Sequence, residues 1–230
     1  ALMATSIAAF KALETEGLDI SDASFVAGHS LGEYSALAAS GAISIADTAR
    51  LLRIRGEAMQ KAVPVGLGAM AALLGLDFET AQAVAKEAAE AGDGEVCQAA
   101  NDNDPGQVVV SGHKAAVERA VEIAKEKGAK RAVLLPVSAP FHCALMQPAA
   151  DVMADALARV DVSAPKVPLV ANVLAEAVTD PVRIRELLVE QVTASVRWRE
   201  SVAWMGAQGV TEMWEIGAGK ALSGMVRRIN

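Results

Sequence analysis

A serine between two glycines is the clearest chemical signal in the sequence. The run Gly28-His29-Ser30-Leu31-Gly32 reads Gly-x-Ser-x-Gly, and it stands between a short apolar run and an expected helix at 33–39. This is the context of a nucleophile elbow, a tight strand-to-helix turn that projects a serine hydroxyl from a sheet. Glycines let the backbone pack closely, and free N–H groups at the helix start favour developing negative charge. The motif predicts a nucleophilic Ser30, with an ordinary glycine–serine turn as the alternative.

A serine nucleophile needs a base, and the chain has three histidines. We expect His142 to be the base, because the prolines of the loop 136–142 would fix its position; capping of the next helix is the alternative. We expect His29 to hydrogen-bond beneath the turn and His113 to have a capping or surface role. With His142 as base, activity should decline below the ordinary imidazole pKa of about 6.5.

Arg55 is a candidate for holding a substrate carboxylate, because a guanidinium can bind one through two parallel hydrogen bonds. It lies in an expected helix at 45–63, on a different face from Arg50 and Arg53. From the residues alone, a solvated arginine on a helix face remains open as the alternative.

Composition excludes several classes of function. The 230 residues are 53% hydrophobic and 3% aromatic, with a net charge of −7, so nothing suggests a nucleic-acid surface. No uncharged apolar run is long enough to span a bilayer, and the apolar N-terminus is not a convincing signal peptide. Two cysteines, Cys97 and Cys143, are too few for a disulfide framework or a CxxC metal site. We expect a reduced, cytoplasmic setting, with neither nucleic acid nor membrane as partner.

The pattern of elements predicts an α/β fold with an insertion. Residues 66–135 are expected to form strand, helix, strand, strand, helix, strand, which is the ferredoxin-like order. The flanking residues, 1–65 and 136–230, are expected to form one large α/β domain whose sheet is parallel. Expected helices lie at 1–14, 45–63, 77–91, 114–127, 144–160, 180–192, 198–207 and 221–228, and expected strands at 22–27, 69–74, 95–100, 107–110, 130–135, 167–170 and 210–216.

Two further expectations concern polar and aromatic residues. The run 101–106, Asn-Asp-Asn-Asp-Pro-Gly, lacks the ligand spacing of a calcium loop, and we expect it to be a turn. The tryptophans at 198, 204 and 214 are expected to anchor the core.

Five segments, in order and over nearly the whole chain, match one family. They are GHSLGEYSALAASG (28–41), RLLRIRGEAMQKAVPVGLGAMAALLGL (50–76), NDNDPGQVVVSGHKAAVERA (101–120), LLPVSAPFHCALMQPAAD (134–151) and EIGAGKALSGMVRRI (215–229). The chain resembles the malonyl-CoA:acyl carrier protein transacylases of fatty acid synthesis, and GHSLGE together with PVSAPFHCALM is highly specific. The resemblance implies an α/β-hydrolase-like large domain with a ferredoxin-like insert.

The resemblance also implies roles for individual residues. Ser30 would be the nucleophile, His142 its base and Arg55 the clamp for the malonyl carboxylate. The backbone N–H of Leu31 would form half of the oxyanion hole, and the main-chain carbonyl of Gln191 would orient the imidazole.

The implied reaction moves a malonyl group from malonyl-CoA to the phosphopantetheine thiol of acyl carrier protein. The CoA thioester is a substrate, so no cofactor and no metal are expected. Acyl carrier proteins are acidic, so docking should use a local basic patch, and the candidates are Lys127, Lys130, Arg131, Arg197 and Arg199.

One departure and two alternatives remain. The family begins with a strand and a Gly-Gln-Gly-Ser-Gln loop whose glutamine supplies the second oxyanion N–H. The sequence contains no such loop, so we expect an N-terminally truncated form, and removing one oxyanion donor can cost about 10²–10³ in rate. The alternatives are a serine esterase or lipase, which would need an acidic triad member and no arginine clamp, and an acyltransferase domain of a larger polyketide or fatty acid synthase.

Overall fold

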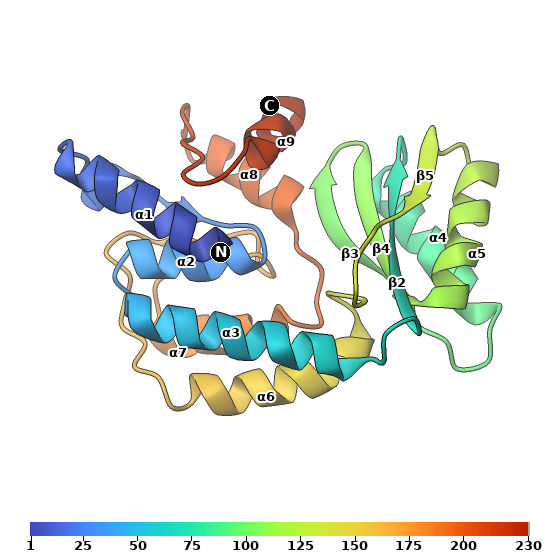
Figure 1. The fold of residues 1–230 in the computed structure, drawn as a ribbon. Coiled ribbons are helices and arrows are strands. Elements are labelled where there is room, and N and C mark those ends of the chain that lie inside the picture. Colours follow the sequence, from blue (N-terminus) through green and yellow to red (C-terminus); the bar gives the residue numbers. More distant parts are fainter. Residues whose placement is uncertain (230) are drawn as a thin grey trace.

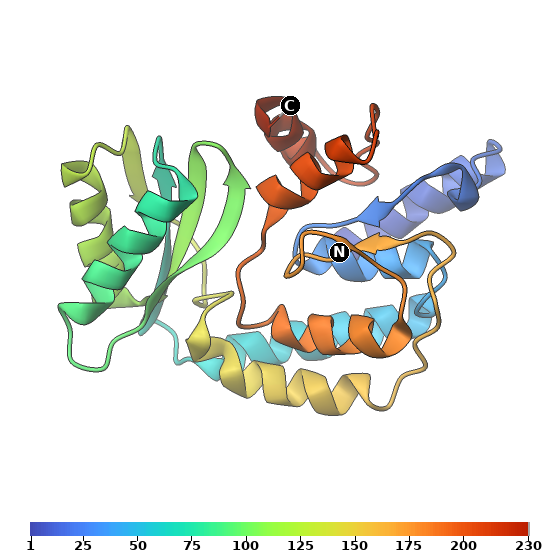
Figure 2. The same cartoon turned by 180° about the vertical axis from the view of Figure 1, so that it is seen from behind.

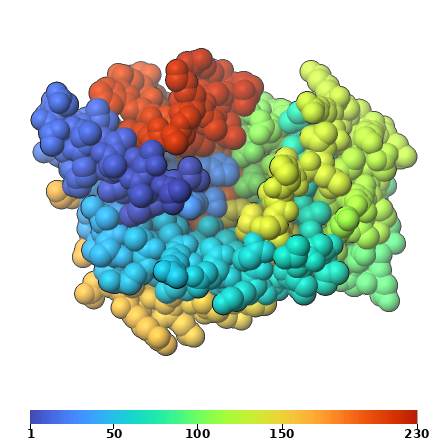
Figure 3. Space-filling model, in the orientation of Figure 1, coloured from blue at the N-terminus to red at the C-terminus, as the bar shows by residue number. Residues whose placement is uncertain are grey.

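The computed structural model describes residues 1–229 and contains two separate sheets that divide the molecule into a large and a small part (Figures 1 and 2). The chain starts in the large part, crosses into the small part after one long helix, and returns through the segment 135–143. Along one face of the molecule the two parts meet at a hollow beside the N-terminal helix (Figure 3).

The small part confirms the predicted ferredoxin-like order. Its elements are β2 (Gly68–Leu74), α4 (Phe78–Glu90), β3 (Cys97–Asp104), β4 (Gln107–His113), α5 (Lys114–Glu126) and β5 (Arg131–Leu134). The strands are antiparallel in the order β3-β4-β2-β5, and both helices cover one face of the sheet (Figure 1). That face buries a cluster of alanines and valines, since α4 and α5 present small residues at helical spacing. Domain limits at 65/66 and 135/136 stay a prediction.

The large part is mostly helical around a very short sheet. Its helices are α1 (Leu2–Thr15), α2 (Leu31–Ala39), α3 (Ile45–Ala62), α6 (Gln147–Leu157), α7 (Pro181–Glu190), α8 (Trp198–Ala207) and α9 (Ala221–Ile229), with 3₁₀ turns η1 (Ile20–Asp22) and η2 (Ala144–Met146). Its strands are β1 (Val26–Ala27), β6 (Leu169–Val170) and β7 (Ala177–Val178). β1 and β6 pair in parallel, as predicted, and β7 adds an antiparallel edge.

The helix α3 illustrates how the sequence sets these elements. It begins at the cap Ser44, whose hydroxyl oxygen accepts a hydrogen bond from the backbone N–H of Asp47 (3.0 Å), and it ends before Pro64. Its buried face packs against α6 and α2 in the main apolar core. No helix within residues 1–229 is long and apolar enough to cross a lipid bilayer.

The prediction of a turn at 101–106 is wrong. β3 continues to Asp104, and only Pro105 and Gly106 form the turn. The polar residues of β3 are buried because the large part supplies their partners: Arg199 from α8 bonds Asp102, and Arg228 from α9 bonds Asp104. Nearby sequence cannot show partners that lie about 100 residues away.

The strand expected at 210–216 is also wrong. Its residues pair with no strand in the described part of the chain, and Trp214, expected in the core, is 61% exposed. Glu215 instead accepts hydrogen bonds from the backbone N–H groups of Leu222 and Ser223, at the start of α9. The segment is therefore a helix-capping loop.

Candidate active site

Ser30 lies at a strained turn between β1 and α2. Its φ of 51° and ψ of −106° are unfavourable for a residue with a side chain, and such strain persists only where surrounding structure imposes it. Gly28 is required here, since a Cβ on it would meet the carbonyl carbon of Gly32 at 2.0 Å. A Cβ on Gly32 would meet nothing within 4 Å, so only the first glycine of the motif is needed for close packing.

Asn172 holds this turn in place. It is fully buried two residues beyond the end of β6. Its side-chain Oδ1 accepts from the backbone N–H of Ser30 (2.7 Å), and its Nδ2 donates to the carbonyl of Gly28 (2.7 Å). The adjacent ends of the parallel strands β1 and β6 bring Asn172 to the elbow. No role was expected for Asn172 from the sequence; the available signal was a polar residue just beyond a strand expected to lie in the same parallel sheet.

Ser30 and His142 form a close pair. Ser30 Oγ lies 2.7 Å from His142 Nε2, and His142 Nδ1 lies 2.8 Å from the main-chain carbonyl of Gln191. The carbonyl can only accept, so Nδ1 carries the proton and Nε2 is free to accept one from the serine hydroxyl. The geometry therefore fits the roles predicted for all three residues.

The pKa of His142 departs strongly from that of a free imidazole. Burial, and then the positive charge of Arg55, lower it from 6.5 to about 3. The ordinary pKa assumed from the sequence is therefore wrong for this site, because burial and a charge supplied by another helix are not visible in the local sequence. The imidazole is neutral at physiological pH, as a general base must be.

Arg55 points into the site and not into solvent. It is 6% exposed, and its Nη2 donates to Ser30 Oγ (3.0 Å) and to Gln191 Oε1 (2.9 Å). The guanidinium also lies 5.7 Å from the ring centre of Tyr34, which suits a cation–π contact. This burial excludes the solvated arginine that the sequence left open, and it sets a fixed positive charge beside the candidate nucleophile.

Gln191 connects more groups than its predicted role requires. Besides the carbonyl that faces His142, its side-chain Nε2 donates to Glu33 Oε2 (2.7 Å) and to the carbonyl of Ser30 (3.1 Å). Glu33 itself is completely buried in the first turn of α2. Its place in the site was missed, although an acidic residue directly after the elbow motif was the signal.

The other two histidines have structural contacts. His29 Nε2 lies 2.8 Å from Asn103 Oδ1 of β3, and its ring packs 5.8 Å from that of Trp198. His113 Nδ1 accepts from the backbone N–H of Val96 (2.8 Å). No hydrogen bond joins either ring to Ser30 Oγ, and the His29 contact is a structural one as expected. His113 occupies the N-cap position of α5, but its side chain makes no capping hydrogen bond.

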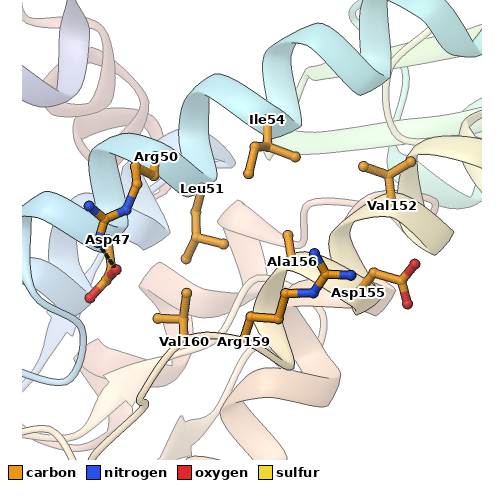
Figure 4. A pocket seen from close by; sticks show the side chains of 9 residues that line it. All are labelled: Asp47, Arg50, Leu51, Ile54, Val152, Asp155, Ala156, Arg159 and Val160. Carbon is orange, nitrogen blue, oxygen red and sulfur yellow. Dashed lines mark hydrogen bonds and ion pairs between the residues drawn. The ribbon is translucent and has the colours of Figure 1, made fainter.

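Of two surface pockets, one lies away from the predicted site residues and the other reaches His142. The one drawn in Figure 4 has a volume of about 460 Å³ and lies between α3 and α6, with none of the predicted site residues in its lining. A second, of about 580 Å³, reaches His142 past α4 and the segment 193–195. Within residues 1–229 no cluster of three or more His, Cys, Asp or Glu side chains could hold a metal ion.

A strained serine on an elbow, its histidine held by a backbone carbonyl and a buried guanidinium beside both define a serine-dependent acyltransferase. The acidic triad member of the esterase alternative is replaced by the Gln191 carbonyl, and the arginine that an esterase would lack is present. The acyl transferase domain family matches residues 1–218. The chain belongs to this family and, within it, to the malonyl CoA-acyl carrier protein transacylases.

Relatives and solved structures agree on this family. The chain is 49% identical over 229 residues to the malonyl CoA-acyl carrier protein transacylase of Escherichia coli K12, covering 100% of the chain and 72% of that protein. It is 47% identical over 230 residues to the Bacillus subtilis 168 transacylase, covering 100% of the chain and 71% of that protein. The crystal structure of acyl-carrier-protein-S-malonyltransferase from Bartonella henselae has a TM-score of 0.95 and 58% identity, covering 99% of this chain and 72% of that one.

A solved complex is also similar to this chain. It contains a type II polyketide synthase acyl carrier protein with its malonyl-transacylase, and the match has a TM-score of 0.94 and 44% identity, covering 99% of this chain and 72% of that one.

Proposed function

We propose that this protein transfers a malonyl group from malonyl-CoA to the phosphopantetheine thiol of acyl carrier protein, through an ester on Ser30. The observation that carries the proposal is the 3.0 Å contact between Arg55 Nη2 and Ser30 Oγ inside the site of a malonyl transacylase family member. In a malonyl group a single CH₂ separates the carboxylate from the reacting carbonyl. A guanidinium one hydrogen bond away from the nucleophile can therefore hold the carboxylate while the carbonyl lies over Ser30.

The first half-reaction loads the enzyme. Ser30 Oγ attacks the thioester carbonyl as its proton passes to His142 Nε2, and the backbone N–H of Leu31 stabilises the oxyanion. Leu31 suits this role because the neighbouring Ser30 N–H already donates to Asn172. The C–S bond then breaks, and the departing CoA sulfur takes the proton from His142.

The second half-reaction unloads it. The pantetheine thiol gives its proton to His142 Nε2, its sulfur attacks the malonyl ester, and Ser30 leaves with the proton returned by the imidazole. The low pKa of His142 makes its protonated form a strong acid, which favours rapid return of the proton to each leaving group. The scheme uses the CoA thioester as substrate and no cofactor or metal.

Three of the five basic residues expected to contact the acidic carrier protein already pair with a carboxylate of this chain. Arg197 bonds Glu200, Arg199 bonds Asp102, and the ammonium of Lys127 lies 3.0 Å from Glu87. The remaining candidates are Lys130 and Arg131, which form no ion pair within residues 1–229. We assign carrier-protein contact to these two. A cytoplasmic setting, supported by the free thiols of Cys97 and Cys143, belongs to the same proposal.

Intact-protein mass spectrometry after brief exposure to malonyl-CoA tests the function. The wild type should gain one malonyl group, and Ser30→Ala should gain none; an adduct on Ser30→Ala would place the nucleophile elsewhere. Arg55→Ala should lose malonyl loading while keeping acetyl loading from acetyl-CoA. Arg53→Ala is the matched control, because its guanidinium lies on the exposed face of the same helix. Equal loss of both acyl groups in Arg55→Ala would contradict the carboxylate clamp.

A further inference from the structure

Glu33 is a buried carboxylate that the transfer scheme does not use. Its Oε2 accepts from Gln191 Nε2 (2.7 Å) and from the backbone N–H of Asn172 (3.2 Å), while its Oε1 has no partner among the described residues. The side chain is 0% exposed and forms no ion pair in the described chain. A buried carboxylate in this position is costly to keep charged, because few groups compensate for its lost hydration.

One amide couples this carboxylate to the carboxylate-binding arginine. Gln191 Oε1 accepts from Arg55 Nη2 (2.9 Å), and Gln191 Nε2 donates to Glu33. Arg55 comes from α3, Gln191 from the end of α7 and Glu33 from α2, so three helices meet at this amide. The three side chains form one hydrogen-bonded chain, and a change of charge at one end is felt at the other.

The negative charge of Glu33 is balanced by Arg55 only while no substrate carboxylate occupies the site. Arg55 is the cation whose charge acts on Glu33, and the other titratable neighbour is Tyr34, which burial keeps neutral by raising its pKa to about 12. Beyond Gln191 lies His142, which is also neutral, and Asn172 and Gln191 carry no charge. With Glu33 ionised, the empty site thus holds one positive and one negative charge.

We propose that Glu33 takes up a proton when a malonyl carboxylate pairs with Arg55, so that the site never holds two buried carboxylates against one guanidinium. This inference rests on the proposed function. The hydrogen bonds allow the neutral form, because the bonds from Gln191 and Asn172 both end on Oε2 and leave Oε1 to carry the proton. Burial also raises the pKa of Glu33 to about 7, which places it within reach of protonation in neutral solution.

The proposal has a defined pH dependence. Binding of the malonyl carboxylate raises the pKa of Glu33, so the protonated enzyme binds malonyl-CoA more tightly. The affinity is fully present below the free-enzyme pKa of about 7. Above it, the affinity falls about tenfold per pH unit, until the pH reaches the pKa of Glu33 in the complex. Acetyl-CoA has no second carboxylate and should show no such fall, so Glu33 makes the preference for malonyl pH-dependent.

Calorimetric titration of the Ser30→Ala protein tests the proposal, because this variant binds the thioester without being acylated. Malonyl-CoA and acetyl-CoA are each titrated at pH 7.5 in two buffers of different ionisation enthalpy, and the difference in heat gives the number of protons taken up. We expect roughly three quarters of a proton for malonyl-CoA and none for acetyl-CoA. In Ser30→Ala/Glu33→Gln, which keeps the shape and removes the charge, malonyl-CoA should bind without uptake.

The possible failures are separable. If malonyl-CoA binds no more tightly than acetyl-CoA, the carboxylate clamp of the proposed function is wrong. If it binds more tightly but takes up no proton, or if uptake survives Glu33→Gln, the inference about Glu33 is wrong. Should the Glu33→Gln protein not fold, Ser30→Ala/His142→Gln decides: uptake retained there assigns the proton to Glu33, and uptake lost assigns it to the imidazole and overturns the proposal.

Discussion

The small and the large part of this molecule are stabilised in different ways. In the small part, strands of four to eight residues pair in antiparallel register, interrupted only by two irregularities in β3, over a core of alanines and valines. In the large part, the strands that lead to the site have two residues each, and side chains such as Asn172 and Gln191 bond the backbone of the elbow over 142 and 161 positions of sequence. Periodic apolar packing builds the first region, whereas in the second single long-range polar contacts fix the elbow above its apolar core.

The two regions meet along β3, and the contact combines both kinds of stabilisation. Backbone bonds join Ala100 and Asp102 to Val196, which extends the small sheet toward the large part. Buried carboxylates and an amide of the same strand bind Arg199, Arg228 and His29. The position of the small part is therefore coupled to the nucleophile elbow through Asn103 and His29.

The largest effect should come from the elbow itself. We expect Gly28→Ala to lose malonyl loading by about 10³-fold or more, since its Cβ would overlap the Gly32 backbone and displace Ser30 from His142. Gly32→Ala should load at nearly the wild-type rate, because its Cβ would enter open space. Initial rates of malonyl-serine formation measure both. Equal loss in the two variants would mean that the motif is needed for something other than close packing.

The second largest effect should come from the Arg199–Asp102 contact between the two regions, and it should fall on stability. Arg199→Met should lower the free energy of unfolding by about 3 kcal/mol, because it leaves Asp102, with a side chain 1% exposed, without its partner. Arg53→Met removes an ion pair of the same kind whose side chains are 83% and 55% exposed, and it should cost under about 0.5 kcal/mol. Urea unfolding of both proteins makes the comparison. Similar losses would show that Asp102 is compensated by groups other than Arg199.

The effect of Asn172 should fall on catalysis more than on folding. Asn172→Ala releases the Ser30 N–H and the Gly28 carbonyl, so the strained turn relaxes and loading should slow by about 10²-fold. Asn103→Ala is the control, since its amide contacts His29 and not Ser30, and its loading rate should fall less. Single-turnover rates of the folded proteins report this. A slower Asn103 variant would place control of the elbow in the small part.

The same contrast explains what the sequence could predict. The strand and helix pattern of residues 66–135 was readable because its packing is local and periodic. Ser30, His142 and Arg55 were found because each belongs to a motif or a distinctive residue type. Glu33 and Asn172 were missed, since their importance arises only where the ends of β1 and β6 meet. The polar residues of β3 were misread as a turn, because their partners lie on α8 and α9.

A change of pH should have the smallest effect on activity. The pH profile also reports most directly how far burial removes His142 from water. The ratio kcat/KM for loading reports groups of the free enzyme, in which burial and Arg55 lower the pKa of His142 to about 3. A lowered pKa keeps the imidazole neutral as the pH falls. From pH 7 to 5.5 kcat/KM for malonyl-CoA should therefore not fall, and it should rise by at most about twofold as Glu33 becomes protonated in the free enzyme. An imidazole with its ordinary pKa of about 6.5 would lose about tenfold in activity at pH 5.5.

Arg55→Met separates the two causes of that shift. Burial is the larger cause and the guanidinium the smaller, so removing the charge should raise the pKa of His142 only in part. Acetyl-CoA loading does not need the clamp. As the pH is lowered, its rate in Arg55→Met should begin to fall at a higher pH than in the wild type, with a midpoint still below about 6.5. An unchanged limb would mean that the fixed charge of α3 acts on the substrate and not on the base, and that desolvation alone tunes His142.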